Sequence, residues 1–316
     1  MAMPQGQVPT FAESALTDDV DESQTAARSD RISRRLKMPT WLAILWENKK
    51  SRIGLIMLTA FLLVAIFAPL IAPHDPRAND FPSNLGSSRD NLLGTTTSGE
   101  DIFSQLIWGA RTSLIVGLVG GLLATIIALI VGMTAGYMGG VVDDVLMFAT
   151  NLALVVPILP LIILLAAYSS QRGLVLIIFI IGITGWAGGA LLKRSQMVTL
   201  RSRDYITAAV FAGDGRARII FKEIMPNMTS LVVVGFLGSA LGAIGAEAGL
   251  SFLGFGDPNT VSWGTISYWA NSQGALVTGQ WLWLLAPGLA LSFLIMSLTL
   301  INFGIDALSN PHLREE

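Results

Sequence analysis

The chain lacks the residues and motifs from which most active sites are built. It contains no cysteine, which excludes disulfides, thiol catalysis and cysteine metal sites, and its two histidines, His74 and His312, stand far apart. There is no GxxxxGKS/T phosphate loop, no HExxH metal-binding motif and no GxSxG nucleophile turn. We therefore expect no enzyme activity, no metal site and no cofactor bound by this chain.

Charged residues are also scarce, at 13% of the chain, whereas hydrophobic residues make up 52% and the mean hydropathy is +0.61. Such a composition is typical of a membrane protein. Six apolar segments each approach the roughly 20 residues that span a bilayer as a helix. They lie at about 54–71, 113–136, 145–168, 174–192, 230–253 and 281–302. The sequence thus predicts an all-α membrane protein with six transmembrane helices.

The basic residues are divided unequally between the two sides of this arrangement. With the N-terminus inside, four of them lie in external segments, namely Arg77, Arg89, Arg111 and Arg172. The other sixteen lie in cytoplasmic segments: Arg28, Arg31, Arg34, Arg35, Lys37, Lys49, Lys50, Arg52, Lys193, Arg194, Arg201, Arg203, Arg216, Arg218, Lys222 and Arg314. Because positive residues favour cytoplasmic loops, we expect both termini and the segment 203–227 in the cytoplasm.

The regions of the chain follow from these patterns. Residues 1–37 are polar and predict a disordered cytoplasmic tail without a secretory signal. Residues 38–72 hold an interfacial helix, with Trp41, Leu42, Leu45 and Trp46 ahead of the first basic residues, and then the first transmembrane helix. Residues 73–111 form an extracytoplasmic loop, 112–305 the membrane core, and 306–316 a cytoplasmic tail.

The segment 203–227 is a polar island within the membrane core, and its pattern predicts a helix, a glycine turn and a second helix. Asp204 is expected as N-cap of the first helix, which places Thr207 at the third helical position. A face of small or aromatic residues follows at helical spacing, namely Tyr205, Ala208, Ala209 and Ala212. Gly213, Asp214 and Gly215 end this helix.

The second helical piece, from Arg216 to Met225, carries Arg218 and Lys222 on one face, and Pro226 marks a further boundary. An ordinary structured loop between membrane helices explains this pattern as well as a docking element does, so the segment alone leaves both interpretations open.

The alanine pair, Gly213 and Met225-Pro226 resemble the EAA loop of ABC importer permeases. The resemblance implies that the segment holds a coupling helix, which docks in a groove of a cytoplasmic ATPase. Two positions depart from the family pattern: Thr207 stands where the family has glutamate, and Met225 stands where it has leucine.

Three further motifs resemble the C-type permeases of the dipeptide and oligopeptide (Dpp/Opp) family. The stretch LGTTTSGEDIFSQLIWGAR at 93–111 is similar to the family's LGTDxxGRDxxSRxxxGxR, with departures at Thr96, Glu100 and Gln105. AEAGLSFLG at 246–254 is similar to AEASLSFLG, and Ser262-Trp263-Gly264 to the family's PSWG element.

This resemblance implies the type I ABC importer (MetI-like) permease fold, in a bacterial or archaeal cell membrane. It also implies partners: a second, B-type permease in a heterodimer, one or two ATPase subunits that use ATP and Mg, an extracytoplasmic substrate-binding protein, and membrane lipid. No nucleic acid is expected. Di- and oligopeptides are the usual substrates, while nickel, glutathione and some oligosaccharides also occur in the family.

Four residues are candidates for the pathway or its gate. Glu247 is an ionisable residue well inside an apolar segment, where a charge costs about 3 kcal/mol or more. It either lines the pathway or forms hydrogen bonds to a neighbouring helix. Ser251 lies one turn further on, and Pro157 and Pro160 are expected to kink or break the third span.

Two other classes of protein are weighed against the permease. An ATP-independent secondary transporter or channel needs coupling groups inside the membrane, and Glu247 alone is thin support for it. A membrane scaffold leaves the glycine-centred segment unexplained. An ATPase that co-purifies with the chain favours the permease over both.

Overall fold

The computed structural model describes residues 45–169 and 173–309, with side chains up to residue 305. The predicted tail 1–37, Trp41, Leu42, Arg172 and residues 310–316 lie outside the described residues. Over the described ranges the chain is helical, apart from turns and a long loop, and an isolated bridge between Thr95 and Asp101 is the sole β pairing there.

The helices are, in chain order, α3 (Lys49–Ile66), α4 (Ala68–Ile71), α5 (Ile102–Ile115), η1 (Val116–Gly120), α6 (Gly121–Met138), α7 (Gly140–Val155), α8 (Ile158–Tyr168), α9 (Leu174–Thr184), α10 (Ala187–Arg201), α11 (Asp204–Phe211), α12 (Arg216–Arg218), η2 (Ile219–Ile224), η3 (Met225–Met228), α13 (Thr229–Phe252), α14 (Trp263–Ser272) and α15 (Trp281–Ser309).

Within the described residues, three continuous helices are long and apolar enough to cross a membrane, at 102–138, 216–252 and 281–305. Two bent pairs, α7 with α8 and α9 with α10, raise the number to five if each pair forms one span. The helix that holds the first apolar segment, α3, begins with Lys49, Lys50 and Arg52 and is not among these candidates. The chain is therefore a helical protein with several apolar helices, and six spans remain a prediction.

The second span begins earlier than the sequence indicated. The expected start was residue 113, at the end of an external loop, whereas the helix begins at Ile102 and runs without interruption to Met138. Asp101 is its N-cap, and its carboxylate accepts a hydrogen bond from the Ser104 amide at 2.8 Å. The last part of the LGTTTSGEDIFSQLIWGAR motif is thus the first part of the membrane helix.

Proline has different effects in two helices. Pro157 separates α7 from α8 and is the N-cap of α8, and the two helices meet at 85°. The predicted break in the third span is therefore confirmed. Pro287 lies near the start of α15, and that helix continues through it without a break.

Glycines of the second apolar segment allow close contacts between helices. A Cβ on Gly121 would lie 2.6 Å from the Ala240 backbone of α13, and one on Gly136 would lie 2.8 Å from a backbone oxygen of α10. The fifth segment differs, because a Cβ on Gly238 or Gly242 would meet nothing within 4 Å. This side of α13 borders open space instead of a neighbouring helix.

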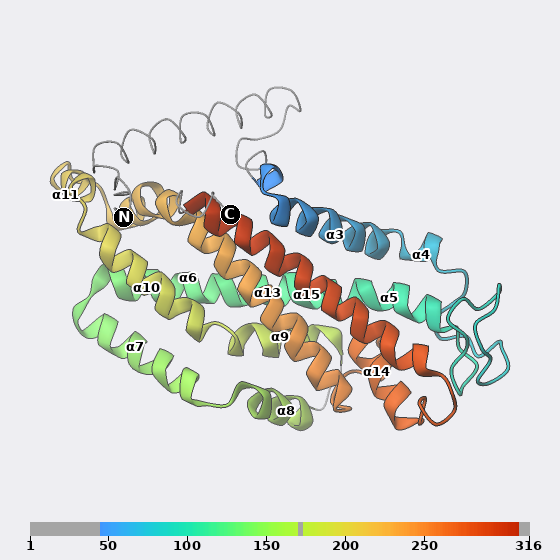
Figure 1. Ribbon diagram of the computed structural model, residues 1–316. Helices are drawn as coiled ribbons and strands as arrows, with labels where there is room; N and C mark the ends of the chain where they lie inside the picture. The colour runs from blue at the N-terminus through green and yellow to red at the C-terminus, as the bar shows by residue number, and fades with distance from the viewer. Residues whose placement is uncertain (1–44, 170–172, 310–316) are drawn as a thin grey trace, which may run out of the picture.

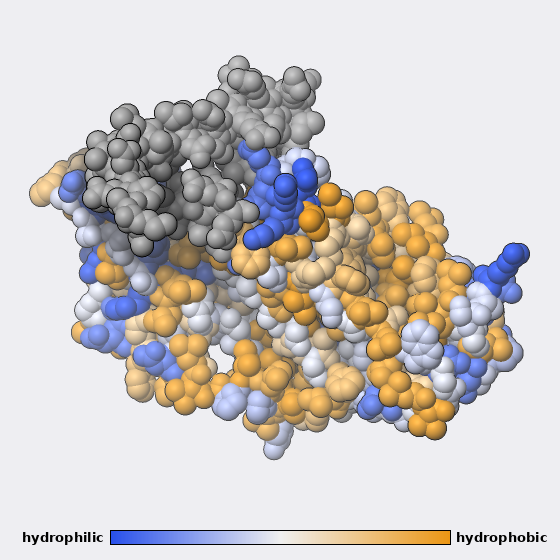
Figure 2. Space-filling model, viewed as in Figure 1, coloured by the Kyte–Doolittle hydropathy of each residue, from blue (hydrophilic) through white to orange (hydrophobic). Residues whose placement is uncertain are grey.

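The helices lie along one long axis, so the molecule has two distinct ends (Figure 1). One end holds α11 and the turns that precede α13. The opposite end holds α4, the loop 72–101 and α14. Hydrophobic residues dominate the middle of the visible face, while hydrophilic residues gather toward both ends (Figure 2). This distribution fits a bundle that crosses a bilayer along its long axis.

Candidate functional site

The helix α11 begins one residue earlier than a cap at Asp204 allows. Arg203 has extended angles (φ −77°, ψ 146°) and is the N-cap, without a side-chain cap hydrogen bond, while Asp204 is already helical. The prediction of Asp204 as N-cap is therefore wrong. Thr207 is the fourth helical residue, so a glutamate there would not form a capping box with residue 204. Asp204 instead places its charge in the first turn, where the helix dipole favours it.

The predicted glycine turn is confirmed in detail. The Gly213 amide donates to Val210 O at 3.0 Å, and the Asp214 amide donates to Ala209 O at 3.1 Å. These two bonds are those of a Schellman motif, in which the residue after the helix takes left-handed angles. Gly213 has φ +84°, which only glycine adopts without strain.

One buried side chain fixes α11 to the bundle. Ile206 is buried and packs in a cluster with Met133 of α6, Met197 of α10, and residues of the turns before α13. Ala209 is half-buried against the same cluster. The helix therefore presents its opposite side to the outside of the molecule.

The predicted small-residue face is divided by this packing. Ala208 and Ala212 are exposed, and Tyr205 is partly exposed, but Ala209 points inward. Sequence reasoning did not select the most exposed apolar side chain of α11: Phe211 has 87% of its surface exposed, and Val210 beside it is also exposed. Helical spacing contained the signal for Phe211, which lies out of phase with buried Ile206, but not for Val210, which lies one turn after Ile206. The exposed surface of α11 thus includes bulky apolar side chains as well as small ones.

The second half of the segment does not end at Pro226. Residues 216–252 form one continuous helix, which starts with α12, widens into a π-helical turn at η2, tightens at η3 and becomes α13. Pro226 sits in the first turn of η3, where the continuous helix changes from a π-helical to a 3-10 hydrogen-bond pattern. Arg216 and Lys222 are exposed, and Arg218 pairs with Asp214 at 3.2 Å. The segment is therefore joined directly to a membrane helix.

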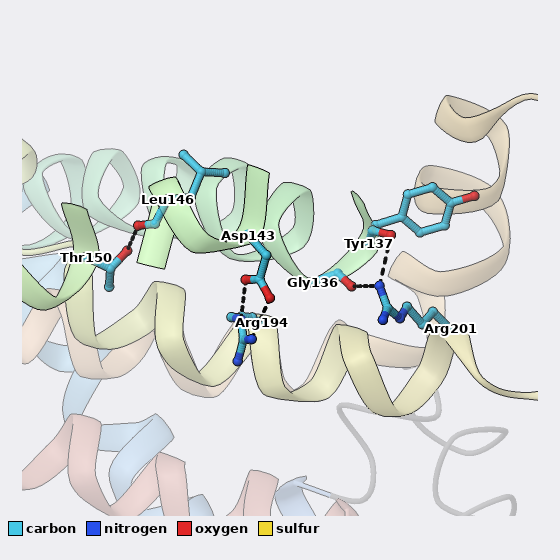
Figure 3. Close-up of polar contacts among 7 residues, drawn as sticks. All are labelled: Gly136, Tyr137, Asp143, Leu146, Thr150, Arg194 and Arg201. Carbon is cyan, nitrogen blue, oxygen red and sulfur yellow. Dashed lines mark hydrogen bonds and ion pairs between the residues drawn. The ribbon is translucent and has the colours of Figure 1, made fainter. Parts of the chain in front are cut away.

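Two arginines of α10 hold the corner between α6 and α7 close to this segment (Figure 3). Arg194 donates two hydrogen bonds to the Asp143 carboxylate of α7, at 2.5 and 2.6 Å. Arg201, the last residue of α10, donates to the carbonyls of Gly136 and Tyr137 at 2.9 and 3.2 Å. These carbonyls end α6, so Arg201 satisfies acceptors that the helix leaves open. The segment 203–227 therefore starts from a rigid support.

Glu247 lies at the other end of α13 and is 2% exposed. Its Oε1 atom accepts hydrogen bonds from Ser251 Oγ at 2.8 Å and from Ser262 Oγ at 2.7 Å. Ser262 is the N-cap of α14, and it forms a capping box with Thr265. Trp263 then donates from Nε1 to Leu106 O of α5 at 2.9 Å. Glu247 thus belongs to a junction of three helices, which supports its structural interpretation over a pathway lining.

The four candidate pathway residues are not brought together. Ser251 lines a cavity of about 180 Å³ beside Tyr268 and Trp269. A larger cavity of about 600 Å³ lies along the glycine side of α13 and is lined by Ile158, Leu159 and Ile162 of α8. Pro157 and Pro160 do not line it, although the bend at Pro157 carries α8 to its wall.

The three departures from the family motif in the outer loop form one contact group. Glu100 Oε2 accepts hydrogen bonds from Thr96 Oγ1 at 3.3 Å and from Gln105 Nε2 at 2.9 Å. The family pattern has an acidic residue at position 96 and basic residues at 100 and 105, so the charges have changed as a set. These three residues contact one another, and their charges are distributed differently from those of the family pattern.

Comparison with known proteins adds the family to this geometry. Residues 128–315 match the family model described as binding-protein-dependent transport system inner membrane component. Residues 41–91 match the N-terminal TM domain of oligopeptide transport permease C. The first match covers more than half of the 316 residues. The chain belongs to this family of transport permeases.

Curated relatives align with most of this chain. The dipeptide transport system permease protein DppC of Bacillus subtilis is 32% identical over 85% of this chain and 83% of its own length. The oligopeptide transport system permease protein OppC of the same organism is 32% identical over 85% and 88%. The di/tripeptide transport system permease protein DppC of Pseudomonas aeruginosa is 32% identical over 88% and 95%. The resemblance inferred from the motifs is confirmed.

Proposed function

We propose that the chain is the membrane permease subunit of an ABC importer for peptides. It crosses a bacterial or archaeal cell membrane six times with both termini inside, and it forms a heterodimer with a second permease. The names of the relatives support the peptide substrate, because all three are dipeptide, oligopeptide or di/tripeptide permeases. An autonomous secondary transporter or channel has no comparable support.

The segment 203–227 docks on a separate ATPase, which uses ATP and Mg. One observation carries this part of the proposal: Val210 and Phe211 are exposed apolar residues at one extreme end of the bundle, outside the long apolar helices. An exposed apolar group on a rigid support is typical of a surface that binds another protein. Ile206 and the two arginines of α10 supply that support.

The opposite end faces a substrate-binding protein outside the membrane. The loop 72–101 and α14 lie there, and a cavity of about 250 Å³ opens between them, lined by Arg77, Glu100 and Trp269 among others. Its polar lining suits contact with a soluble partner. At this surface, Glu100 is acidic where the family pattern has a basic residue.

Co-expression with an ABC ATPase subunit from the same organism tests the docking part. Phe211→Ser should lower the affinity of the ATPase by about 2 kcal/mol, roughly thirtyfold, because a central aromatic residue is lost from the interface. The matched control is Val277→Ser, since Val277 is 93% exposed in the turn after α14. Unchanged co-purification of the ATPase with Phe211→Ser would refute docking at this segment.

A further inference from the structure

Arg111 carries an exposed positive charge near the outer end of α5. Its guanidinium group lies over the ring of Trp108, with 5.8 Å from Cζ to the ring centroid. Within residues 45–169 and 173–305, no carboxylate lies within ion-pair distance of it. Arg77 of the loop 72–101 is also exposed and forms no ion pair in these ranges. The outer end of the bundle therefore holds two guanidinium groups that a ligand can reach.

The length of the helix places Arg111 at the level of the outer headgroups. The continuous helix 102–138 is longer than the bilayer core requires. At 1.5 Å per residue, Arg111 lies roughly 40 Å from the inner end of this helix at Met138. A bilayer with its headgroups is about 40–45 Å thick, so Arg111 meets the outer headgroups when Met138 lies at the inner ones. Trp108 lies one turn further out, and tryptophan is enriched at this interface.

Both arginines line a cavity of about 710 Å³ where α4, the loop 72–101 and α5 meet. Among the described lining residues, Asp75 is the acidic one, and its Oδ1 atom accepts a hydrogen bond from the Arg77 amide at 2.9 Å. His74 also lines the cavity, and its Nε2 atom lies 3.1 Å from Asp90 O. Two guanidinium groups thus face one carboxylate, and the lining favours an anion.

Much of the remaining lining is apolar. Ile115 lies one turn after Arg111 on α5 and is 37% exposed, and Pro69 of α4 and Val261 line the same cavity. Ile115 lies closer to the bilayer centre than Arg111, because α5 runs inward from Ile102. The volume is within the usual range of ligand sites, about 300–1,000 Å³. The cavity thus offers charge near the headgroups and apolar surface toward the membrane core, which suits an amphiphilic ligand.

We propose that this cavity binds a membrane phospholipid, whose phosphate group pairs with Arg111 and Arg77. A guanidinium group matches phosphate oxygens in geometry and binds them through paired N–H donors. An acyl chain of the lipid then covers Ile115. A free phosphate ion shares the headgroup chemistry but leaves the apolar lining uncovered. The inference goes beyond the proposed function and rests on it only for the orientation of the chain in the membrane.

Lipid binding to the purified permease in detergent, measured by native mass spectrometry, tests the site with two probes. These are phosphatidylglycerol and a diacylglycerol with the same acyl chains but no phosphate. Arg111→Gln should weaken the binding of phosphatidylglycerol about tenfold, since a charge-assisted hydrogen bond is lost. The binding of diacylglycerol should be the same in both proteins.

Two controls separate this site from general attraction between charges. Arg89→Gln removes the same charge from an exposed position of the loop 72–101 that does not line the cavity, and it should bind both lipids as the unmodified chain does. Inorganic phosphate in large excess should not displace phosphatidylglycerol. Because Arg111 is exposed, Arg111→Gln should keep its thermal stability, which the same sample reports.

Unchanged binding of phosphatidylglycerol by Arg111→Gln would overturn the proposal, as would equal losses for the two lipids or an equal loss in Arg89→Gln. Displacement by inorganic phosphate would indicate a site for the free ion and would also refute a lipid. A failure of the proposed function looks different, because the complete complex would then show no ATP-driven uptake of peptides. The lipid affinities are measured on the permease alone and do not depend on that uptake.

Discussion

The two ends of α13 show how differently one helix can terminate. At the end with Glu247, two serine hydroxyls donate to Oε1 and a tryptophan indole donates to α5, so three helices are joined. The Oε2 atom of Glu247 is buried without a hydrogen-bond partner among the described residues. At the other end, the chain turns outward through η2 and α11 and leaves Phe211 in the open. The first arrangement is formed by contacts within the chain. The second leaves an apolar side chain exposed, so we propose that another subunit binds there.

The largest expected effect comes from substitution of Glu247. Glu247→Leu removes the acceptor of two buried hydroxyls, and each unsatisfied group costs about 1–3 kcal/mol. The free energy of unfolding should fall by about 2–4 kcal/mol, measured as a loss of thermal stability in detergent. Glu247→Gln keeps an oxygen for both donors and should cost less than about 1 kcal/mol.

Transport by Glu247→Gln decides between the two roles of this residue. A junction residue predicts normal peptide uptake in this variant. Normal thermal stability with lost uptake would show instead that the charge acts in the pathway or gate.

The second prediction concerns backbone strain in the turn after α11, which leaves the contacts of the helix bundle unchanged. Gly213→Val places a β-branched residue at φ +84°, which costs about 1–3 kcal/mol of local strain. Because a Cβ at this position meets nothing within 4 Å, the strain lies in the backbone alone. The variant should insert normally, but its complex should transport less peptide for each ATP that the partner ATPase hydrolyses.

Gly215 provides the matched control for this variant. It has φ −69° and equally open surroundings, so valine fits there without strain. If Gly213→Val and Gly215→Val transport equally well, the turn does not matter for coupling.

A third prediction compares two ion pairs near the same end. Arg194→Met breaks two hydrogen bonds to partly buried Asp143 and should lower the unfolding free energy by about 1–2 kcal/mol. Arg218→Met breaks an exposed pair with Asp214 and should cost at most about 0.5 kcal/mol. Thermal unfolding of both variants measures the difference. Equal losses would mean that α7 does not depend on the clamp of α10.

The smallest effect belongs to Thr207→Glu, which restores the residue typical of the family. With Arg203 as the N-cap, the new carboxylate lies in the second turn of α11 and gains only a weak interaction with the helix dipole, about 0.3 kcal/mol. Affinity for the ATPase should remain within twofold, measured by titration of the purified subunits. A tenfold gain would show that a glutamate at this position contacts the partner directly.

Much of this architecture could be predicted from composition and spacing. The approximate places of the apolar helices, the turn at Gly213 and the break at Pro157 follow from local chemistry, because left-handed angles need glycine and proline lacks an amide. The cap of α11 could not be placed to one residue, because side-chain chemistry favours Asp204 as the cap, whereas it is Arg203 that takes extended angles.

Tertiary packing decided what the sequence left open. Lys193 and Arg194 are neighbours with the same charge, yet one points into α13 and the other pairs with α7. Likewise, the exposure of Phe211 follows from the contact of Ile206 with α6 and α10, which no local pattern contains. Helix periodicity gives the relative phase of such residues, but not which side meets the bundle.

Thiol labelling tests the central claim most directly, because the chain has no cysteine of its own. Phe211→Cys and Val277→Cys each place one thiol at a position that is 87% or 93% exposed, at opposite ends of the molecule. The labelling rate of each is measured on the permease alone and on its complex with the ATPase. We predict that the ATPase slows the labelling of residue 211 at least tenfold and leaves residue 277 unchanged. Equal labelling of residue 211 in the two states would contradict the assignment of α11 as the docking helix.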